Sequence, residues 1–579
     1  MDTQKNERPG SWRSLFRTIR RLKLSWLWIA VALALNLLLN TLLLDLPDTT
    51  ADLMGGQLTG AALTGAIMYY VVFGLLSAVM VAGLVQAQSV GVRRARQSIW
   101  QKMLGMRMEY FDRNDPSDLM SAITNDADSA VRDFVNSLIN LIPDIYYVVM
   151  ALRRINQYHW ILAVSCFALL PLKYLYALIM GRQFQVHTAR LYGRIGQLTS
   201  FLADRITHLP LIKTYTNEAA EGEQGKGAAK RLLDANMKLV HLDNISLGAS
   251  SVLDILQKFI VVVVAVILLQ RKQIDIAMWL AFFLFAQNLF PTMDDIFDLW
   301  MRIKSMHGSF ARISEIMDGQ DEEAGACGAF PETGDIRFEN VTFTYPETEE
   351  PALKDVSFTV PRGSAVAIVG LCGSGKTTSV SLLERFYTPD EGRILIGDTD
   401  IRDISLSDFR KNFAYVQQGA AIVSGTLREA LTYGIDRRVT DEEILSAAEQ
   451  TGLNEYLRLC RDCLDTEIAP GAESMSGGQS QRLVLTRELL RGGSIILMDE
   501  PNSALDVRVS AKIQDTMDAV FADKTRILIT HDLNFAKKYR RILVMERGRL
   551  VGDGTHETLL STCEAYRKMN ENAAKAVTV

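Results

Sequence analysis

The sequence has little cysteine and no large excess of charge of either sign. Six cysteines in 579 residues are too few for a disulfide scaffold. Cys460 and Cys463 stand alone as a C-x-x-C spacing, so we interpret them as two small apolar residues on one helix face rather than as zinc ligands. The 62 basic and 67 acidic residues leave a formal charge of −5, and this mild acidity argues against a nucleic-acid-binding protein.

Lysine and arginine are also missing from a long N-terminal stretch. Neither occurs between Leu24 and Val92, although hydrophobic residues make up 48% of the chain and the mean hydropathy is +0.08. This apolar content excludes disorder over the whole chain. Because ~20 apolar residues in a helix cross a bilayer core, the first half predicts an all-α transmembrane domain. We expect six helices, at about 25–46, 60–88, 134–152, 160–181, 247–269 and 277–300.

The first apolar run could also be a cleavable signal peptide. Its apolar core is longer than the central region of a signal peptide, and no small-residue cleavage site follows, so we favour a permanent anchor. The acidic segment from Asp45 to Asp52 is expected to be a short polar loop between the first two membrane helices.

Basic residues indicate how the helices are oriented. Clusters before the first helix and after the second place both flanks in the cytoplasm, and six crossings return the chain to that side. Arg153, Arg154, Arg271 and Lys272 fall in outside loops and are local exceptions. The clusters consist of Lys5, Arg8, Arg13, Arg17, Arg20, Arg21 and Lys23, and of Arg93, Arg94, Arg96 and Lys102.

Two long polar insertions, residues 93–133 and 182–246, lie on the cytoplasmic side of this arrangement. They are interpreted as membrane helices that continue into the cytoplasm. We expect the chain to reverse at residues 111–118 in the first insertion and at 208–210 in the second. A polar, glycine-containing segment at 318–334 predicts a linker. The expected domains are therefore 1–317 and 335–579, joined by this linker.

The second half contains a glycine-rich loop between a strand and a helix. An apolar, β-branched run leads into G-x-x-x-x-G-K-T, the P-loop pattern in the context that it requires. Its backbone N–H groups would surround phosphate oxygens at a helix N-terminus. We expect Lys376 to reach the β- and γ-phosphates and Thr377 to bind Mg²⁺. The other expected nucleotide-binding residues of this loop are Gly370, Gly373, Ser374, Gly375 and Thr378.

A second buried strand ends in two carboxylates, Asp499 and Glu500. Parallel α/β sheets place ligands at the carboxyl ends of their strands. Asp499 can therefore hold Mg²⁺, directly or through water, and Glu500 can act as the general base that polarises the attacking water.

Together with these motifs, residues 473–482 resemble the signature sequence of ABC transporters, with Met475 where leucine is usual. The order of motifs along the chain also matches that family. The resemblance covers nearly the whole chain and is to an exporter-type half-transporter, with six membrane helices fused to one α/β P-loop ATPase domain. It implies ATP and Mg²⁺ as cofactors.

The resemblance assigns further roles. Tyr345 matches the aromatic residue that stacks on adenine, and Gln418 matches the loop glutamine that contacts Mg²⁺ and water, with Gln417 as the alternative register. Asp506 matches a loop that crosses the dimer interface. His531 matches the histidine that binds the γ-phosphate and the catalytic glutamate. The signature residues Ser476, Gly477, Gly478 and Gln479 match those that close on ATP held by the other subunit.

The resemblance also implies how motion is transmitted. Residues 110–128 and 211–218 are similar to the two coupling regions, which dock on nucleotide-binding domains in that family. The sequence departs from the family at Pro470, where a glutamate is usual, and at Asn502, where a threonine is common. The first change puts the coupling contacts there in doubt, and neither removes a group required for hydrolysis.

In that family, the signature residues that complete an ATP site come from a second subunit. The resemblance therefore implies a dimer with a second half-transporter. All hydrolytic residues are present, which favours a homodimer and leaves a heterodimer open. The implied function is ATP-driven export of a small molecule, lipid or peptide across the cytoplasmic (inner) membrane, with the nucleotide-binding domain and N-terminus in the cytoplasm. An importer of the same fold, for example for a metallophore, is the alternative, and no nucleic-acid partner is expected.

Several charged residues fall in or near the expected membrane segments. Such charges usually face a cavity or a neighbouring helix. Asp144 and Lys173 are expected either to pair with each other or to contact cargo. If the acidic residues line a cavity, they favour cationic or zwitterionic cargo. The others are Asp254, Lys258, Asp294, Asp295 and Asp298.

Overall fold

The computed structural model divides the chain into two compact units. The helical unit takes in the chain up to Leu104 together with Asp115–Gly319, and the sheet unit takes in Gly105–Asn114 and the chain from Gln320 onward. The structure describes residues 12–55, 60–325, 328–331, 334–346, 348–417, 419, 421–469, 475–501 and 507–577.

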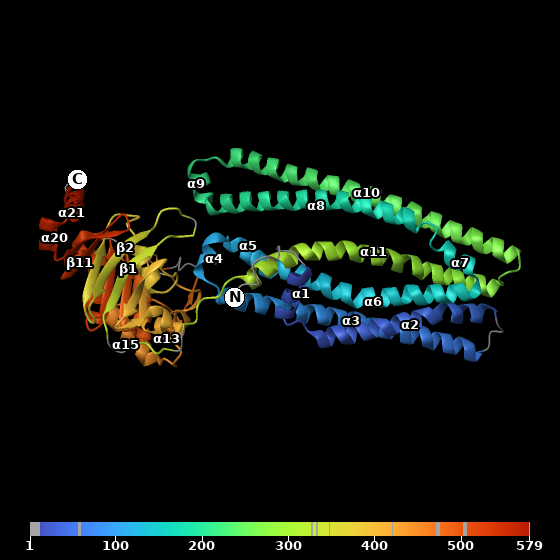
Figure 1. The fold of residues 1–579 in the computed structure, drawn as a ribbon, viewed down its shortest axis with the longest axis horizontal. Coiled ribbons are helices and arrows are strands. Elements are labelled where there is room, and N and C mark those ends of the chain that lie inside the picture. Colours follow the sequence, from blue (N-terminus) through green and yellow to red (C-terminus); the bar gives the residue numbers. More distant parts are fainter. Residues whose placement is uncertain are drawn as a thin grey trace. The chain divides into compact units, whose positions relative to one another are not determined.

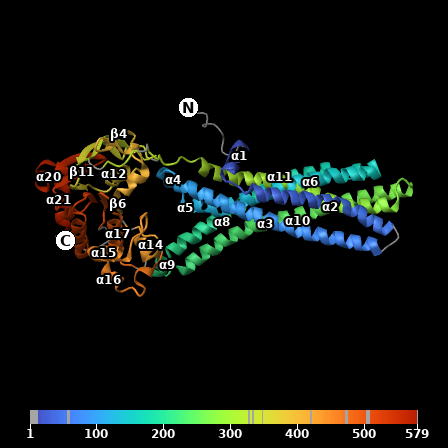
Figure 2. The same ribbon diagram turned by 90° about the horizontal axis from the view of Figure 1, so that it is seen from below.

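The helical unit consists of long helices, several of which are much longer than a bilayer is thick. The longest, α10, has 53 residues, which corresponds to ~80 Å. Figures 1 and 2 both show α8 and α10 running side by side. The helices are α1 (Trp12–Arg21), α2 (Trp26–Gly55), α3 (Gly60–Leu104), α5 (Pro116–Ser121), the π-helical turn η1 (Ala122–Asp126), α6 (Ala127–Tyr158), α7 (Trp160–Ser165), α8 (Leu170–Thr207), α9 (Leu209–Thr214), α10 (Glu218–Gln270) and α11 (Ile276–Asp318).

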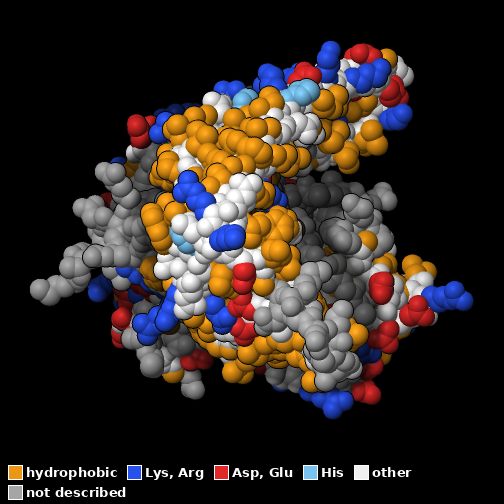
Figure 3. All heavy atoms as spheres, turned by 90° about the vertical axis from the view of Figure 1, so that its right-hand side faces the viewer, with side chains coloured by type: hydrophobic (Ala, Val, Ile, Leu, Met, Phe, Trp, Pro, Cys, Tyr) orange, Lys and Arg blue, Asp and Glu red, His pale blue; other side chains and the backbone are white. Residues whose placement is uncertain are grey.

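Six helical stretches among the described residues are long and apolar enough to cross a membrane, which confirms the six predicted from the sequence. Their outward side chains are apolar, as lipid contact requires. Leu27 is 75% exposed and Met68 is 69% exposed. Figure 3 shows hydrophobic side chains gathered over the face of the helices that it presents.

The fourth membrane stretch is broken between α7 and α8, just before Pro171. A break frees backbone carbonyls that lipid cannot satisfy. The buried Gln257 of α10 donates its Nε2–H to the Cys166 carbonyl at this break, with an N···O distance of 2.9 Å. A side chain from a neighbouring helix thus replaces the missing helical hydrogen bond.

The segment from Asp45 to Asp52 is helical, so the predicted polar loop is wrong. Helix α2 continues through Pro47 as far as Gly55. Asp45 and Asp48 accept hydrogen bonds from Arg154 of α6, at 2.8 and 2.6 Å. These ion pairs engage Arg154, one of the four basic residues that contradicted the charge-based orientation.

The sheet unit contains two main sheets. In the six-stranded sheet, of order β12-β11-β3-β10-β9-β6, every neighbouring pair is parallel except β11 with β12, and the other is the antiparallel sheet β2-β1-β4-β5. The strands are β1 (Ile336–Phe343), β2 (Leu353–Val360), β3 (Ala365–Val369), β4 (Glu391–Ile396), β5 (Thr399–Asp400), β6 (Phe413–Val416), β7 (Gly425–Thr426), β8 (Glu467–Ile468), β9 (Ile495–Asp499), β10 (Thr525–Thr530), β11 (Arg541–Glu546) and β12 (Arg549–Gly554).

The parallel sheet is covered on both faces. Successive strand residues point to opposite sides, and each side joins its own core. On β3, Val366 and Ile368 join the core shared with the antiparallel sheet, whereas Ala367 and Val369 join a core shared with helices. The helices of this unit are α4 (Met108–Arg113), α12 (Lys376–Leu383), α13 (Leu406–Lys411), α14 (Leu427–Leu431), α15 (Asp441–Thr451), α16 (Asn454–Leu457), α17 (Gly477–Arg491), α18 (Val507–Val520), α19 (Leu533–Ala536), α20 (His556–Thr562) and α21 (Glu564–Val577), with the 3-10 turns η2 (Ile401–Asp403) and η3 (Cys463–Asp465).

The two cysteines of the C-x-x-C spacing do not share a helix, which corrects the interpretation from the sequence. Helix α16 ends at Leu457, Cys460 lies in the following loop, and Cys463 is exposed at the start of η3. Within the described part of the chain, no group of His, Cys, Asp and Glu is arranged to hold a metal ion.

Candidate nucleotide-binding site

The P-loop connects the buried strand β3 to the N-terminus of α12. Gly375 has a φ of +98°, and a Cβ there would lie 2.7 Å from Leu353 Cδ2 and 2.8 Å from the Ala352 carbonyl oxygen. At Gly370 a Cβ would lie 2.4 Å from Ser374 Oγ. Only glycine fits either position, because one needs a left-handed backbone and both need close approach. The loop is therefore held tightly against the surrounding strands.

Two polar side chains of this loop have the arrangement expected of a phosphate site. Ser374 Oγ is buried and has no hydrogen-bond partner, which is uncommon for a buried polar atom. Lys376, only 6% exposed, donates to the carbonyl oxygens of Gly370 and Leu371 at 2.9 and 3.0 Å. A hydroxyl without a partner and an ammonium group folded onto its own loop both fit an anionic ligand at this position.

Asp499 closes the other side of the site from the end of β9. It is 4% exposed, and the hydroxyl groups of Thr377 and Tyr415 bond its carboxylate. Burial raises the pKa of Asp499, and the bond from Thr377 opposes that rise. A Mg²⁺ ion would favour the ionised carboxylate, so Asp499 and Thr377 together fit a magnesium site.

Glu500 follows Asp499 in an unusual backbone conformation. Its φ is +44°, which costs about 1–3 kcal/mol for a non-glycine residue. Its backbone N–H donates to the Ile529 carbonyl at 2.9 Å, and this bond ties it to the neighbouring strand β10. His531 follows that strand, and its Nδ1 lies 3.0 Å from Glu500 Oε1. The structure thus brings together two residues that are 31 positions apart in the chain.

Tyr345 lies in an aromatic group beside the helix that follows the P-loop. Its hydroxyl donates to Thr378 Oγ1 at 3.3 Å. Its ring centroid lies 5.0 Å from that of Phe343 and 5.3 Å from that of Tyr387. These contacts place Tyr345 close to the P-loop helix, and its stacking on adenine stays a prediction.

The signature residues form the N-terminus of α17. Ser476 Oγ accepts from the Gln479 N–H, and Gln479 Oε1 accepts from the Ser476 N–H, so the two residues make a reciprocal capping box. Gly477 and Gly478 begin the helix. Among the described contacts, none joins these four residues to the P-loop, Glu500 or His531. This is the arrangement expected if they serve a second nucleotide site.

Some of the predicted residues lie outside the described part of the chain. These are Gln418, Pro470, Asn502 and Asp506. Gln417, the alternative to Gln418, is described and is exposed at the end of β6.

Comparisons with known proteins agree with this geometry. The family model for the ABC transporter transmembrane region matches residues 24–293, and the ABC transporter model matches residues 353–503. The chain belongs to the ABC transporter family. ATP binding and ATP hydrolysis follow from this membership, and so does a multi-pass location in a membrane.

Similar proteins are found over almost the full length of this transporter. The ATP-dependent lipid A-core flippase of Haemophilus ducreyi is 27% identical over 96% of this chain and 97% of its own. That of Escherichia coli K12 is 27% identical over 97% of each chain. A solved bacterial Atm1-family ABC exporter with ATP bound has a TM-score of 0.82 at 22% identity and covers 97% of this chain and 99% of its own. This last likeness concerns the fold.

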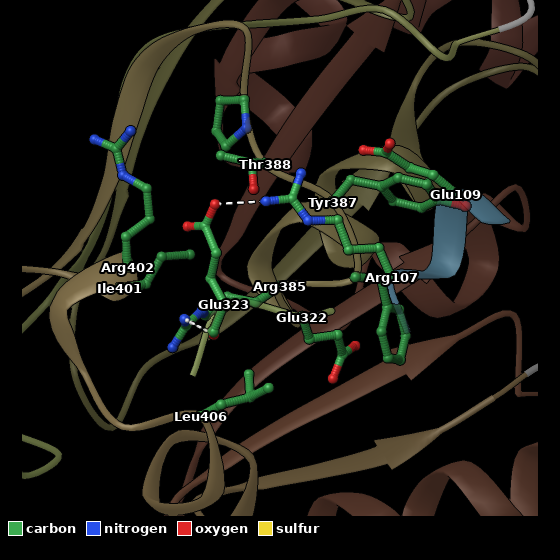
Figure 4. A pocket seen from close by; sticks show the side chains of 12 residues that line it. Arg107, Glu109, Glu322, Glu323, Arg385, Tyr387, Thr388, Ile401, Arg402 and Leu406 are labelled. Atoms are coloured by element: carbon green, nitrogen blue, oxygen red, sulfur yellow. Dashed lines mark hydrogen bonds and ion pairs between the residues drawn. The ribbon is translucent and has the colours of Figure 1, made fainter. Parts of the chain in front are cut away.

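The transporter's sheet unit contains a short helix whose neighbours in sequence belong to the helical unit. Helix α4 follows the long helix α3 and packs with the sheet unit. Arg107 donates to Glu323 at 2.6 Å, and Glu322 N–H donates to the Gly105 carbonyl at 2.8 Å. Figure 4 shows Arg107 and Glu323 facing each other across a small pocket that Tyr387 also lines. The first of the predicted coupling regions thus begins as part of the sheet unit.

Tyr387 is a residue that the sequence analysis missed. Its hydroxyl bonds Asp112 of α4, and its ring packs against Tyr345. It therefore contacts both the expected adenine-stacking residue and the coupling segment. Tyr415, which bonds Asp499, was missed too. Neither carries a motif signal, since aromatic residues near strands are common in any core.

The membrane charges form a group different from the expected pair. Lys173 of α8 has other partners than Asp144: its Nζ lies 2.6 Å from Asp254 Oδ1 of α10 and 3.1 Å from Asp294 Oδ1 of α11. Lys173 is 9% exposed. One buried cation thus joins three membrane helices, in keeping with the rule that such charges pair inside a helix bundle.

Proposed function

We propose that the chain is one half of an ATP-driven exporter that moves an amphipathic lipid out of the inner leaflet of a bacterial inner membrane. A single observation carries the proposal. The P-loop, the Asp499 carboxylate and the Glu500–His531 pair are assembled in one chain with six lipid-length apolar helices. The residue-level domain division that goes with it is 1–317, a linker at 318–334, and 335–579.

The residues of the site take the following roles in this proposal. Lys376 and the loop N–H groups hold the phosphates, and Tyr345 stacks on adenine. Glu500 orients and polarises the attacking water, and His531 holds Glu500 in place and reaches the γ-phosphate. Mg²⁺, held by Thr377, Gln418 and Asp499, would neutralise charge on the phosphates.

The site is completed by a second subunit. The capped N-terminus of α17 makes no described contact with the P-loop of its own chain, yet a helix N-terminus is suited to an anionic phosphate. Ser476 and its neighbours would therefore close on ATP held by the partner. Because the chain contains both halves of such a site, a homodimer is sufficient, and pairing with a different half-transporter stays open.

ATP would clamp the two sheet units together through charge-assisted hydrogen bonds to its phosphates. Hydrolysis and phosphate release remove these bonds, and the clamp opens. Only contacts that differ between the closed and open states can drive motion of the helices. Helix α4 is bonded to Tyr387, and Arg107, just before it, is bonded to Glu323, so this segment would carry that motion to α3.

Relatives support export of a lipid. The similar full-length proteins are described as lipid A-core flippases and the structural neighbour as an exporter, which favours export over import. The basic clusters of the sequence support a cytoplasmic location for the N-terminus, the insertions and the sheet unit. A lipid cargo would reach the membrane helices from the bilayer. The exposed side chains of these helices are largely apolar and so are compatible with lipid contact.

The test uses the full chain reconstituted in proteoliposomes with fluorescent lipids. We expect ATP-dependent loss of lipid from the leaflet facing the sheet unit, together with lipid-stimulated ATP hydrolysis. The Glu500→Gln variant is the matched control, since it keeps the fold and removes the base. Lipid movement that continues at the same rate in this variant would overturn the proposal, as would an ATPase rate that no lipid changes.

A further inference from the structure

The segment that follows α11 is bonded to the sheet unit at several of its residues. Asp321 pairs with Met106 in an antiparallel bridge, and the Leu406 N–H donates to the Ala324 carbonyl at 3.0 Å. Figure 4 shows Glu322 among the side chains that line one pocket of this unit. These residues are therefore fixed to the sheet unit, although the chain reaches them directly from α11.

Glu322 forms the strongest side-chain contact of this segment, a two-pronged ion pair with Arg410 of α13. Arg410 Nη1 donates to Glu322 Oε2 at 3.0 Å, and its Nη2 donates to Oε1 at 2.9 Å. This bidentate geometry fixes the plane of the guanidinium group as well as its place. The Phe386 ring centroid lies 5.3 Å from the guanidinium carbon. The side chains are only 23% and 33% exposed, so this pair differs from an ordinary surface ion pair.

Arg410 also contacts the ends of two helices that begin at ATP motifs. Helix α12 begins at Lys376 of the P-loop, and the Arg385 carbonyl just after it lies 3.5 Å from Arg410 Nη2. Helix α17 begins at the signature residues, and its last residue, Arg491, donates to the Arg410 carbonyl at 2.8 Å. One residue thus touches the far ends of the P-loop helix and the signature helix.

A third element of the ATP site follows Arg410 directly in the chain. Strand β6 begins at Phe413 and carries Tyr415, whose hydroxyl bonds the Asp499 carboxylate. The strand leads to Gln417 and the predicted magnesium ligand Gln418. A shift of Arg410 would therefore reach the expected magnesium site through β6, because strand residues are held in one register by the neighbouring β9.

The buried Glu384 indicates what Arg410 would do without Glu322. It lies at the end of α12, is 7% exposed, and has one carboxylate oxygen without a hydrogen-bond partner. Burial raises its pKa to about 8, and the charge of the nearby Arg410 opposes that rise. With Glu322 lost, the guanidinium group would turn towards Glu384 and displace the end of α13. Glu322 thus decides which of two carboxylates Arg410 bonds.

We propose that Glu322 is a positioning residue for ATP hydrolysis, which acts through Arg410 on the placement of α12, α17 and β6. The place of the segment after α11 then becomes a condition for the geometry of the ATP site. Small displacements far from the reacting atoms slow a reaction, because water, base and phosphate must keep their relative arrangement. The inference requires ATP hydrolysis and does not depend on which cargo is exported.

The test is steady-state ATP hydrolysis by the full chain in lipid nanodiscs, with the Tm measured on the same samples. The variants are Glu322→Gln, Arg410→Gln and the double variant. The matched control is Glu339→Gln, which makes the same change to a carboxylate that Arg393 bonds at 2.8 Å between β1 and β4. If Arg410→Gln does not fold, Arg410→Lys replaces it, because lysine keeps the charge but cannot form the fork.

We expect each single variant to lower kcat roughly two- to thirtyfold while the KM for ATP stays as it is. The double variant should lose no more than Arg410→Gln does, since both substitutions remove the same contact. Glu339→Gln should keep the kcat of the unaltered chain.

An unaltered kcat in Glu322→Gln would overturn the inference, and a lower Tm beside it would assign the pair to stability alone. Losses that multiply in the double variant would overturn it as well, because the two residues would then act separately. So would an equal loss of kcat in Glu339→Gln, since any ion pair of this unit would then have the same effect.

Discussion

His531 Nδ1 lies 3.0 Å from Glu500 Oε1, at the ends of two neighbouring parallel strands. The Glu500 backbone is left-handed and tied to β10 by the hydrogen bond to Ile529. Strain of this kind persists only where the surrounding structure fixes it. The surrounding structure therefore fixes the backbone of Glu500 beside His531, and such preorganisation suits a water-activating site.

Replacing Glu500 by glutamine should stop hydrolysis while ATP still binds. The amide keeps the size and a hydrogen bond but cannot accept the proton from water, so we expect kcat to fall about 10²–10⁴-fold. Single-turnover hydrolysis and equilibrium binding of ATP measure the two effects separately. The His531→Ala variant should lower kcat as well, by loss of positioning. A Glu500→Gln enzyme with an unchanged kcat would refute the role of the base.

Tyr387 should affect coupling more than ATP binding. The Tyr387→Phe variant keeps the ring against Tyr345 but loses the hydrogen bond to Asp112 of α4. We expect the coupling free energy to fall by about 0.5–2 kcal/mol. The amount of lipid moved per ATP hydrolysed should then fall roughly two- to thirtyfold. The KM for ATP should stay as it is. Transport and ATPase assays on the same proteoliposomes give the ratio.

The Asp112→Asn variant provides the comparison, because its amide oxygen still accepts the tyrosine hydroxyl. It should retain more coupling than Asp112→Ala. If Tyr387→Phe changes the KM for ATP and leaves the ratio of transport to hydrolysis intact, Tyr387 supports the nucleotide site and not the coupling segment.

Lys173 should stabilise the packing of three membrane helices. The Lys173→Met variant leaves Asp254 and Asp294 without their shared cation. Interhelical polar contacts in membranes contribute about 0.6–1.7 kcal/mol each, so a lower Tm is expected. Neutralising both aspartates as well, in Lys173→Met/Asp254→Asn/Asp294→Asn, should restore much of the stability because it removes the two negative charges that Lys173 balanced. Thermal unfolding of detergent-solubilised protein decides this. A triple variant less stable than Lys173→Met would contradict the account.

Glu384, at the end of α12, should make the stability of the sheet unit depend on pH. Burial raises its pKa from 4.5 to about 8, and one of its carboxylate oxygens has no hydrogen-bond partner. Between the unfolded pKa and about 8, the unfolded chain has lost this proton while the folded one keeps it. Stability should therefore fall as pH rises through this window, and it should level off above it.

The Glu384→Gln variant removes this dependence. Its Tm should exceed that of the unaltered chain at pH 8 and approach it at pH 5, because the amide stays neutral throughout. The exposed Glu391→Gln serves as the matched control and should leave the pH profile unchanged. A Glu384→Gln protein whose Tm falls with pH as steeply as before would show that another group is responsible.

Much of the fold could be predicted from the sequence because its signals are local. Six apolar runs predict membrane helices, since a helix satisfies its backbone hydrogen bonds within its own segment where lipid offers no partners. The P-loop pattern specifies its own conformation, as Gly370 and Gly375 show: any larger residue would collide with the loop's neighbours. The prediction at Asp45–Asp52 failed because two of the charges that suggested a loop, Asp45 and Asp48, pair with Arg154, which lies far away in the sequence.

The sequence by itself thus determined the family of the chain, its membrane helices, and which side chains are available for ATP chemistry, because each of these depends on residues close together in the chain. Only the tertiary structure decided which distant side chains meet. It placed His531 on Glu500, Tyr387 between Tyr345 and Asp112, and Lys173 between two aspartates. Contacts of this kind depend on how strands and helices are ordered in space, and no local pattern of residue types encodes that order.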